Sequence, residues 1–338
     1  MKRAGHLIEQ IATWENVAAA YWQAAQGKRR SAGVQRFAAD FDGEIQRLVR
    51  DLADGTWQPG AYQMFQVRDP KLRVIHAAPF RDRVAHHALM RVCAAPLERG
   101  AVPQSYACRI GRGSHAAVRY AAGRARAWRF YLKLDVRKYF DSVCHARLEH
   151  LLRRVIKDGA VLDLLAKVIG SYGSASGRGL PIGTLTSQYF ANFFLDGMDR
   201  WIMGGLGCRD YVRYMDDFVL WHKDVARLTD WGRQIGEWLD AERGLGLKRE
   251  PEVLPCREGM EFLGYRVVPG RILMARRSRR RFVRKLRANE AAHEAGLISG
   301  VELQRRVDAL LGWLKIADCQ VWRDRVCQGR TDREEVAA

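Results

Sequence analysis

Two adjacent aspartates, Asp216 and Asp217, lie between two runs of aromatic and β-branched residues, 211–215 and 218–221. Such runs favour strands, so the sequence predicts a β-hairpin whose tight turn carries both acids. A pair of acids between strands is most often a solvated turn, but the apolar flanks argue against that interpretation here. Two carboxylates at the tip of a buried hairpin repel each other and lose solvation unless a cation binds them. Mg²⁺ prefers oxygen ligands, so the pattern predicts a metal site.

A third carboxylate, Asp135, follows the alternating run Phe-Tyr-Leu-Lys-Leu at 130–134. This run predicts a strand that delivers Asp135 at its end. If the strand lies beside the hairpin, the three carboxylates could hold two Mg²⁺ ions, for which Mn²⁺ is an expected substitute. Such a pair of ions activates a 3′-hydroxyl and stabilises the leaving pyrophosphate, so the residues predict a nucleotidyl transferase.

Two further segments could contact a nucleotide. Residues 61–76 alternate around a turn at Asp69-Pro70, which predicts a hairpin with Lys71 and Arg73 near its tip. An exposed basic hairpin can be no more than a soluble edge strand, or it can present Arg73 to a triphosphate. The glycine-rich segment 179–188 is predicted to open a helix, and small residues there let the backbone approach a phosphate or base pair closely.

The remaining pattern is mostly helical. Helical periodicity predicts helices within 5–55, over 79–97, 148–169 and 224–243, and from 275 to about 325, whereas 261–267 and a segment starting at 245 predict strands. The segment 275–287 is dense in Lys and Arg beside Phe282, Val283 and Leu286. That density predicts a helix that faces nucleic acid, in preference to a merely solvated face.

Composition supports a nucleic-acid partner. The 338 residues carry 57 Lys and Arg against 38 Asp and Glu, a formal charge of +19, and 48% of the chain is hydrophobic. A folded protein this basic usually binds a polyanion, with an anionic membrane surface as the alternative. The sequence shows neither a spanning apolar run nor a signal peptide, and its seven cysteines form no C-x-x-C pair. We therefore expect a cytoplasmic protein with reduced thiols and no zinc or disulfides.

These motifs, in this order, resemble those of reverse transcriptases from about residue 62 to 267. Asp135 matches the first catalytic aspartate, and Tyr-Met-Asp-Asp at 214–217 matches the Y-x-D-D box. The resemblance implies an α+β right-hand polymerase with fingers, palm and thumb, a ferredoxin-like palm sheet and a helical basic thumb. The implied domains are a helical N-terminal extension (1–60), fingers with an interleaved palm helix (61–130), a palm (131–268, with 149–185 partly fingers) and a thumb (269–338).

The resemblance also implies a role for individual residues. Implied metal ligands are Asp135, the main chain of Val136, Asp216 and Asp217, the three aspartates being catalytic. Implied contacts of the incoming dNTP are Lys71, Arg73, Phe140 as the steric gate against a 2′-hydroxyl, Ile182, Gly183, and Lys248 as a proton donor to pyrophosphate. Implied primer or template contacts are Gln188, Phe262 and Gly264 in the primer-grip region, and Arg277, Arg280 and Arg284.

One departure narrows the resemblance. Most reverse transcriptases carry Q-G-x-x-x-S-P at the glycine-rich helix start, where this chain has Ile-Gly-Thr-Leu-Thr-Ser-Gln at 182–188. With Trp14-Glu15-Asn16, Gly27-Lys28-Arg29 and a short basic thumb, this variant is similar to the reverse transcriptases of diversity-generating retroelements. That family copies a template-repeat RNA into cDNA, misincorporates opposite template adenines and works with a small basic accessory variability protein. Replacing Gln by Ile removes a polar side chain beside the nascent pair and should relax discrimination.

Two alternatives stay open. One is another bacterial reverse transcriptase of the retron, group II intron or abortive-infection type, although no maturase extension is expected in the remaining residues. The other is a catalytically silent RNA-binding protein with a polymerase fold. Three intact aspartates argue against the second, because RNA binding alone does not require them. The expected partners are template RNA, a DNA or cDNA primer, dNTPs and the accessory protein, with no membrane.

Overall fold

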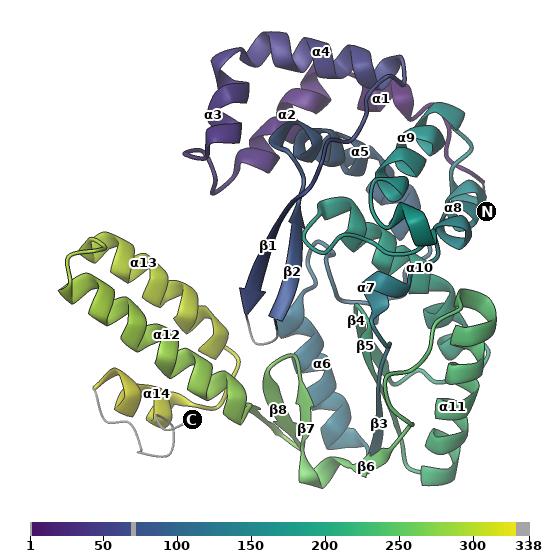
Figure 1. Ribbon diagram of the computed structural model, residues 1–338. Helices are drawn as coiled ribbons and strands as arrows, with labels where there is room; N and C mark the ends of the chain where they lie inside the picture. Colours follow the sequence, from purple (N-terminus) through teal and green to yellow (C-terminus); the bar gives the residue numbers. More distant parts are fainter. Residues whose placement is uncertain (1, 69–71, 329–338) are drawn as a thin grey trace. The chain divides into compact units, whose positions relative to one another are not determined.

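The computed structural model, drawn in Figure 1, describes residues 2–68 and 72–328. The chain divides into two compact units. The first unit comprises Met1–Cys108, Asp135–Gly207 and Gln234–Glu250, and the second comprises Arg109–Leu134, Cys208–Arg233 and Pro251–Ala338. Each unit is therefore assembled from three separate stretches of the chain. The predicted contact Lys71 lies outside the described residues.

The first unit is mainly helical and carries one hairpin. Its elements are α1 (Ile8–Ile11), α2 (Trp14–Ala25), α3 (Ala32–Ala39), α4 (Phe41–Ala53), the antiparallel strands β1 (Gln63–Arg68) and β2 (Leu72–Ala77), α5 (Phe80–Glu98), α7 (Tyr139–Ser142), α8 (His145–Val155), α9 (Gly159–Gly170), η1 (Ser174–Ser176), α10 (Leu185–Gly204) and the π-helix η2 (Leu239–Arg243). The predicted helices within 5–55 and over 79–97 and the predicted hairpin are confirmed.

Asn16 fixes the N-terminal helices on α5. The hydroxyl of Thr13 caps α2 by accepting a hydrogen bond from the Asn16 main chain at 3.1 Å. The Asn16 side chain in turn donates to the carbonyls of Ile11, at 3.0 Å, and Ala88, at 3.1 Å. This explains structurally why Asn follows Trp-Glu at the start of α2, since one amide joins the end of α1 to α5.

The predicted helix over 148–169 is wrong in extent, because two helices, α8 and α9, replace it. Asp158 causes the break. Its carboxylate caps α9 by accepting from Val161 N and also accepts from the main-chain nitrogens of Leu7, at 2.8 Å, and Ile8, at 3.1 Å. Burial alone would raise the pKa of Asp158, but these three N–H groups hold it below its usual value. A residue in this capping role cannot continue the preceding helix.

The second unit contains a four-stranded and a three-stranded sheet and the basic C-terminal helices. Its elements are α6 (Ser114–Ala127), β3 (Phe130–Asp135), β4 (Tyr211–Tyr214), β5 (Asp217–His222), α11 (Val225–Trp238), β6 (Val253–Pro255), η3 (Cys256–Glu258), β7 (Met260–Phe262), β8 (Tyr265–Val268), β9 (Arg271–Met274), α12 (Arg276–Glu294), α13 (Gly300–Leu311), η4 (Gly312–Leu314) and α14 (Gln320–Cys327). The last residue of β3 and the end of α11 already belong to the first unit.

The four-stranded sheet has the order β4-β5-β3-β6. Helices separate β3 from β4, a tight turn joins β4 to β5, and α11 separates β5 from β6, which is the β-α-β-β-α-β connectivity of a ferredoxin-like sheet. The strand residues Leu132, Val212, Phe218, Val219 and Leu220 are fully buried and explain the strongly apolar runs in the sequence.

Two predicted strands are wrong. The segment 261–267 is a hairpin, because Leu263 and Gly264 have φ angles of 51° and 86° and reverse the chain between β7 and β8. The segment from Leu245 to Lys248 makes only an isolated bridge, between Val136 and Leu247. Pro251 follows within a few residues and has no N–H with which to extend a ladder.

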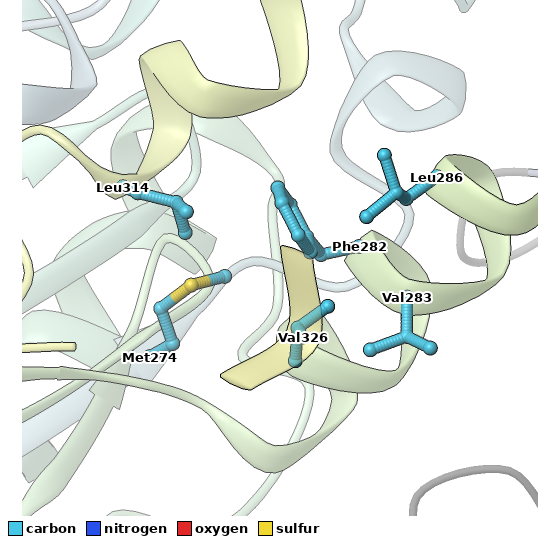
Figure 2. Close-up of a cluster of buried hydrophobic side chains, with 6 residues drawn as sticks. All are labelled: Met274, Phe282, Val283, Leu286, Leu314 and Val326. Carbon is cyan, nitrogen blue, oxygen red and sulfur yellow. The ribbon is translucent and has the colours of Figure 1, made fainter. Parts of the chain in front are cut away.

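The basic segment 275–287 is helical as predicted, and its apolar side chains form a small core. Figure 2 shows this cluster, whose buried members are Met274, Phe282, Val283, Leu286, Leu314 and Val326. Helices α12 and α13 lie side by side in Figure 1 and contact each other. Arg284 and Lys285, which stand between Val283 and Leu286, are exposed on a face of α12 that this core does not cover.

The structure bears on two expectations from the sequence, namely membrane-spanning helices and the state of the cysteines. In the part of the chain that the structure describes, no helix is both long enough and apolar enough to cross a bilayer. All seven cysteines are free thiols. Burial raises the pKa of Cys93 and Cys208 to about 12, so both stay protonated and unreactive at neutral pH.

His86 on α5 makes stability depend on pH. It is buried against the edge of Trp57, and its Nε2 has no hydrogen-bond partner within the described residues. Burial, with a smaller effect of His87, lowers the pKa of His86 from 6.5 to about 4. Between these values the unfolded chain binds a proton that the folded chain does not. Stability is therefore fully present above pH 6.5 and falls as the pH falls, by about 3 kcal/mol at pH 4 for this group.

We expect His86→Leu to remove this contribution, because leucine fills the site without a titrating nitrogen. Urea unfolding of both proteins at neutral pH and at about pH 4 measures the difference. Parallel loss of stability in the variant and the original chain would contradict the assignment to His86.

Candidate active site

The hairpin β4–β5 carries the two adjacent aspartates as predicted. Tyr214 pairs with Asp217, which leaves Met215 and Asp216 as a two-residue turn. Met215 has a φ of 56°, a left-handed conformation that costs a non-glycine residue about 1–2 kcal/mol. Arg213, which is fully buried, donates from Nη1 to the Met215 carbonyl at 3.0 Å. This bond helps to hold the strained turn and thereby the position of Asp216.

In the second unit, Asp217 is bound by Lys133. The Lys133 ammonium lies 3.1 Å from Asp217 Oδ2, donates to the Glu261 carbonyl at 2.7 Å and lies 5.7 Å from the centre of the Phe262 ring. The sequence analysis did not single out Lys133. A signal existed, since Lys133 stands two residues before Asp135 on the same face of β3.

Asp135 ends β3, and β3 lies between β5 and β6 in the sheet. The strand that delivers Asp135 is therefore the neighbour of the strand that begins with Asp217, as the prediction required. Within the first unit, the Asp135 carboxylate contacts the Lys248 ammonium, and the Lys248 main chain donates to the Asp135 carbonyl at 2.9 Å. The structure thus joins two residues that the sequence analysis had placed in different roles.

The main-chain N–H and C=O of Val136 make no hydrogen bond in the isolated bridge that pairs Val136 with Leu247. The two hydrogen bonds of that bridge run from Arg137 N to Gly246 O and from Lys248 N to Asp135 O. Neither uses the carbonyl of Val136, which suits its predicted role as a main-chain metal ligand.

The donor chemistry fits a hard divalent cation. The predicted ligands offer carboxylate and carbonyl oxygens, and lysine ammonium groups already offset the charge of Asp135 and Asp217. Among residues 2–68 and 72–328, no group of three or more His, Cys, Asp or Glu side chains is placed so that it could hold a metal ion. The predicted two-ion site stays a prediction.

The glycine-rich loop before α10 lies on β2 in the first unit. His76 N donates to the Ile182 carbonyl at 2.9 Å. Gly183 has a φ of 116°, and a Cβ there would lie 2.7 Å from a methyl group of Ile75, so only glycine fits. Arg73 is exposed further along the same strand. The structure therefore brings three predicted dNTP contacts, Arg73, Ile182 and Gly183, onto β2 or against it.

Phe140 lies beside the same loop. Its carbonyl accepts a hydrogen bond from Leu180 N at 2.7 Å, two residues before Ile182. Its half-buried ring contacts Tyr139 edge-on. Gln188 is half-buried in the first turn of α10, which Thr184 caps. One loop thus connects the predicted steric gate with the predicted dNTP contacts Ile182 and Gly183 and leads to Gln188.

The primer-grip residues form a tight corner in the second unit. Phe262 is buried, and Gly264 accepts a hydrogen bond from Ala275 N at 3.2 Å. A Cβ at Gly264 would lie 3.0 Å from Ser278 Oγ, so the start of α12 packs closely on this turn. Of the predicted contacts on α12, Arg277 and Arg284 are exposed and Arg280 is half-buried.

A known protein family matches more than half of the chain. The family model described as "Reverse transcriptase (RNA-dependent DNA polymerase)" matches residues 68–267. Protein YkfC of Escherichia coli K12 is 26% identical in an alignment 273 residues long, and the alignment covers 67% of this chain and 71% of YkfC. The group II intron-encoded protein LtrA of Lactococcus lactis is 22% identical over 169 residues, which are 47% of this chain and only 28% of LtrA.

Among solved structures, telomerase from Candida albicans with a fragment of telomeric RNA matches with a TM-score of 0.49 and 13% identity. The match covers 64% of this chain and 46% of that chain. Likeness at this level decides nothing about the present chain.

Proposed function

Because the chain belongs to the reverse transcriptase (RNA-dependent DNA polymerase) family, we propose that it copies a template-repeat RNA into cDNA as the polymerase of a diversity-generating retroelement. Errors at template adenines would then diversify a target gene. The observation that carries the polymerase part is the strained turn with Asp216 and Asp217, next in the sheet to the strand that ends at Asp135. The retroelement part depends on Ile182, docked by its carbonyl on β2.

Reverse transcriptases use divalent metal ions. In this chain Asp135, Asp216 and the Val136 carbonyl would hold them, with Asp217 assisting. When bound, two such ions lower the pKa of the primer 3′-hydroxyl and offset charge on the pyrophosphate. Mg²⁺ is the proposed ion, and Mn²⁺ could substitute.

The chain's own side chains would position the nucleotide. The exposed guanidinium of Arg73 can bind the triphosphate in a bidentate manner, and the Phe140 ring can exclude a ribose 2′-hydroxyl. Lys248 can donate a proton to pyrophosphate only after its ion pair with Asp135 opens. Its contact with Asp135 therefore describes the enzyme before the nucleotide binds.

In this proposal, residues 1–60 are an N-terminal extension, 61–130 contribute fingers, 131–268 the palm and 269–338 the thumb. The exposed arginines of α12 and the net charge of +19 favour binding to template and primer backbones. The retroelement class further implies a small basic accessory protein that assists the polymerase on its structured RNA.

A group II intron-like reverse transcriptase is the second candidate. Its support is the similarity to the group II intron-encoded LtrA, of which the chain spans 28%. A silent RNA-binding protein is the third candidate. The turn argues against this candidate, because RNA binding does not require the strained left-handed conformation of Met215 beside two aspartates.

Primer extension on an RNA template, with Mg²⁺ and sequencing of the cDNA, distinguishes these functions. Extension with errors concentrated opposite adenine is the expected result, and the accessory protein and native RNA are added in parallel reactions. Faithful extension would keep the polymerase and refute the retroelement class. No extension in any reaction would favour the RNA-binding protein.

We expect Ile182→Gln to raise fidelity at template adenines, because a polar side chain beside the nascent pair restores a hydrogen-bonding check. Such a check is worth about 10-fold or more in discrimination. Sequencing of cDNA made by both proteins measures it. Thr186→Ser, a conservative change of a buried residue in the first turn of α10, serves as the control. An unchanged error spectrum would remove Ile182 from the explanation.

A further inference from the structure

Lys133 differs from an ordinary surface lysine because its side chain, which starts on β3, connects that strand to two others of the second unit. It stands on β3, pairs with Asp217 on β5 and donates to the main-chain carbonyl of Glu261 on β7. The exposed fractions of the Lys133 and Asp217 side chains are 32% and 24%, so the pair is partly shielded from water.

A partly exposed ion pair alone would contribute little to stability. Here, however, the carbonyl and the adjacent Phe262 ring restrict the ammonium from two further directions. A lysine ammonium is a compact point charge with rotatable donors, which can serve a carboxylate and a carbonyl at once. The position of Asp217 Oδ2 is thereby tied to the main chain of β7.

We infer that Lys133 is a positioning residue that orients Asp217 and neutralises its charge, and that it couples the acidic turn to β7 and the primer-grip turn at Gly264. The inference rests on the proposed polymerase function. It assigns a defined partner to one of the adjacent acids, because Asp217 at the start of β5 contacts a lysine of its own unit. Lys133 itself touches no reacting atom.

The test compares Lys133→Met, which keeps the apolar stem without the charge, with Lys223→Met as the matched control. Lys223 is exposed just after β5, and its loss changes the net charge equally. We expect Lys133→Met to lower kcat about tenfold with little change in KM for dNTP, because orientation and not binding is lost. Lys133→Arg keeps the charge and should partly restore kcat.

Binding of Mn²⁺ without nucleic acid, followed by electron paramagnetic resonance, is the second readout. Since Lys133→Met removes the positive charge that faces Asp217 Oδ2, the Mn²⁺ dissociation constant should fall about threefold while kcat also falls. A merely structural lysine would weaken Mn²⁺ binding and lower the melting temperature together. That result would overturn the inference.

A double-mutant cycle completes the test. If Lys133 acts through Asp217, Lys133→Met should add almost nothing to Asp217→Asn, whereas additive losses would refute the coupling. If the original chain extends a primer and the kcat of Lys133→Met is within about twofold of the original kcat, the inference about Lys133 is also refuted. A wild-type chain that extends no primer refutes the polymerase proposal instead, and the Mn²⁺ measurement then still decides the role of Lys133.

Discussion

Asp216→Asn is expected to reduce primer extension by about 10³-fold or more, because the divalent ion that we propose at this position would be worth several kcal/mol of charge stabilisation in the transition state. The substitution keeps the shape of the side chain and removes one negative charge from the turn. The strain at Met215 and its bond from Arg213 are unaffected. Repulsion from Asp217 is relieved, so the melting temperature should stay the same or rise slightly.

Primer extension at saturating dNTP, with thermal denaturation of the same samples, checks both expectations. Asp163→Asn is the matched control, since Asp163 is exposed on α9 and undergoes the same chemical change. Activity of Asp216→Asn within about tenfold of the original chain would contradict a metal-binding role for Asp216.

Arg213→Leu is expected to lower the free energy of unfolding by about 4 kcal/mol, from an unsatisfied carbonyl together with a partly filled space. Arg213 is fully buried under the turn, and its Nη1 supports the Met215 carbonyl. Without it, Met215 can relax from its left-handed conformation and move Asp216. We therefore also expect activity to fall by more than the loss of folded protein explains.

Urea unfolding measures the stability, and extension assays well below the unfolding midpoint measure the activity. Arg209→Leu makes the same exchange at an exposed position just before β4 and should change stability by no more than about 0.5 kcal/mol. Equal stability of the two variants would show that the buried guanidinium does not support the turn.

The local pattern of apolar and polar residues determined the type and position of several helices and strands in this protein. The apolar runs around Asp216 predicted the hairpin, and the alternation before Asp135 predicted a strand that ends on an acid. The periodicity of 275–287 predicted a helix with one apolar face, which Figure 2 shows packed into a small core. These features follow from side-chain periods of two or 3.6 residues, which neighbours along the chain set by themselves.

Tertiary structure decided what periodicity does not encode. Asp158 splits a predicted helix because it also accepts hydrogen bonds from Leu7 and Ile8, about 150 residues away. Leu263 takes a positive φ beside Gly264, a conformation that its residue type alone disfavours.

The lysines that contact Asp135 and Asp217 are the clearest example of what the tertiary structure decides. The pairs Lys133–Asp217 and Lys248–Asp135 join residues far apart in the sequence, and no local pattern selects them. They form because folding sets which strands are neighbours, and a buried or half-buried carboxylate then takes the nearest cation. The sequence alone identified the acids, whereas the fold determined which lysine each of them contacts.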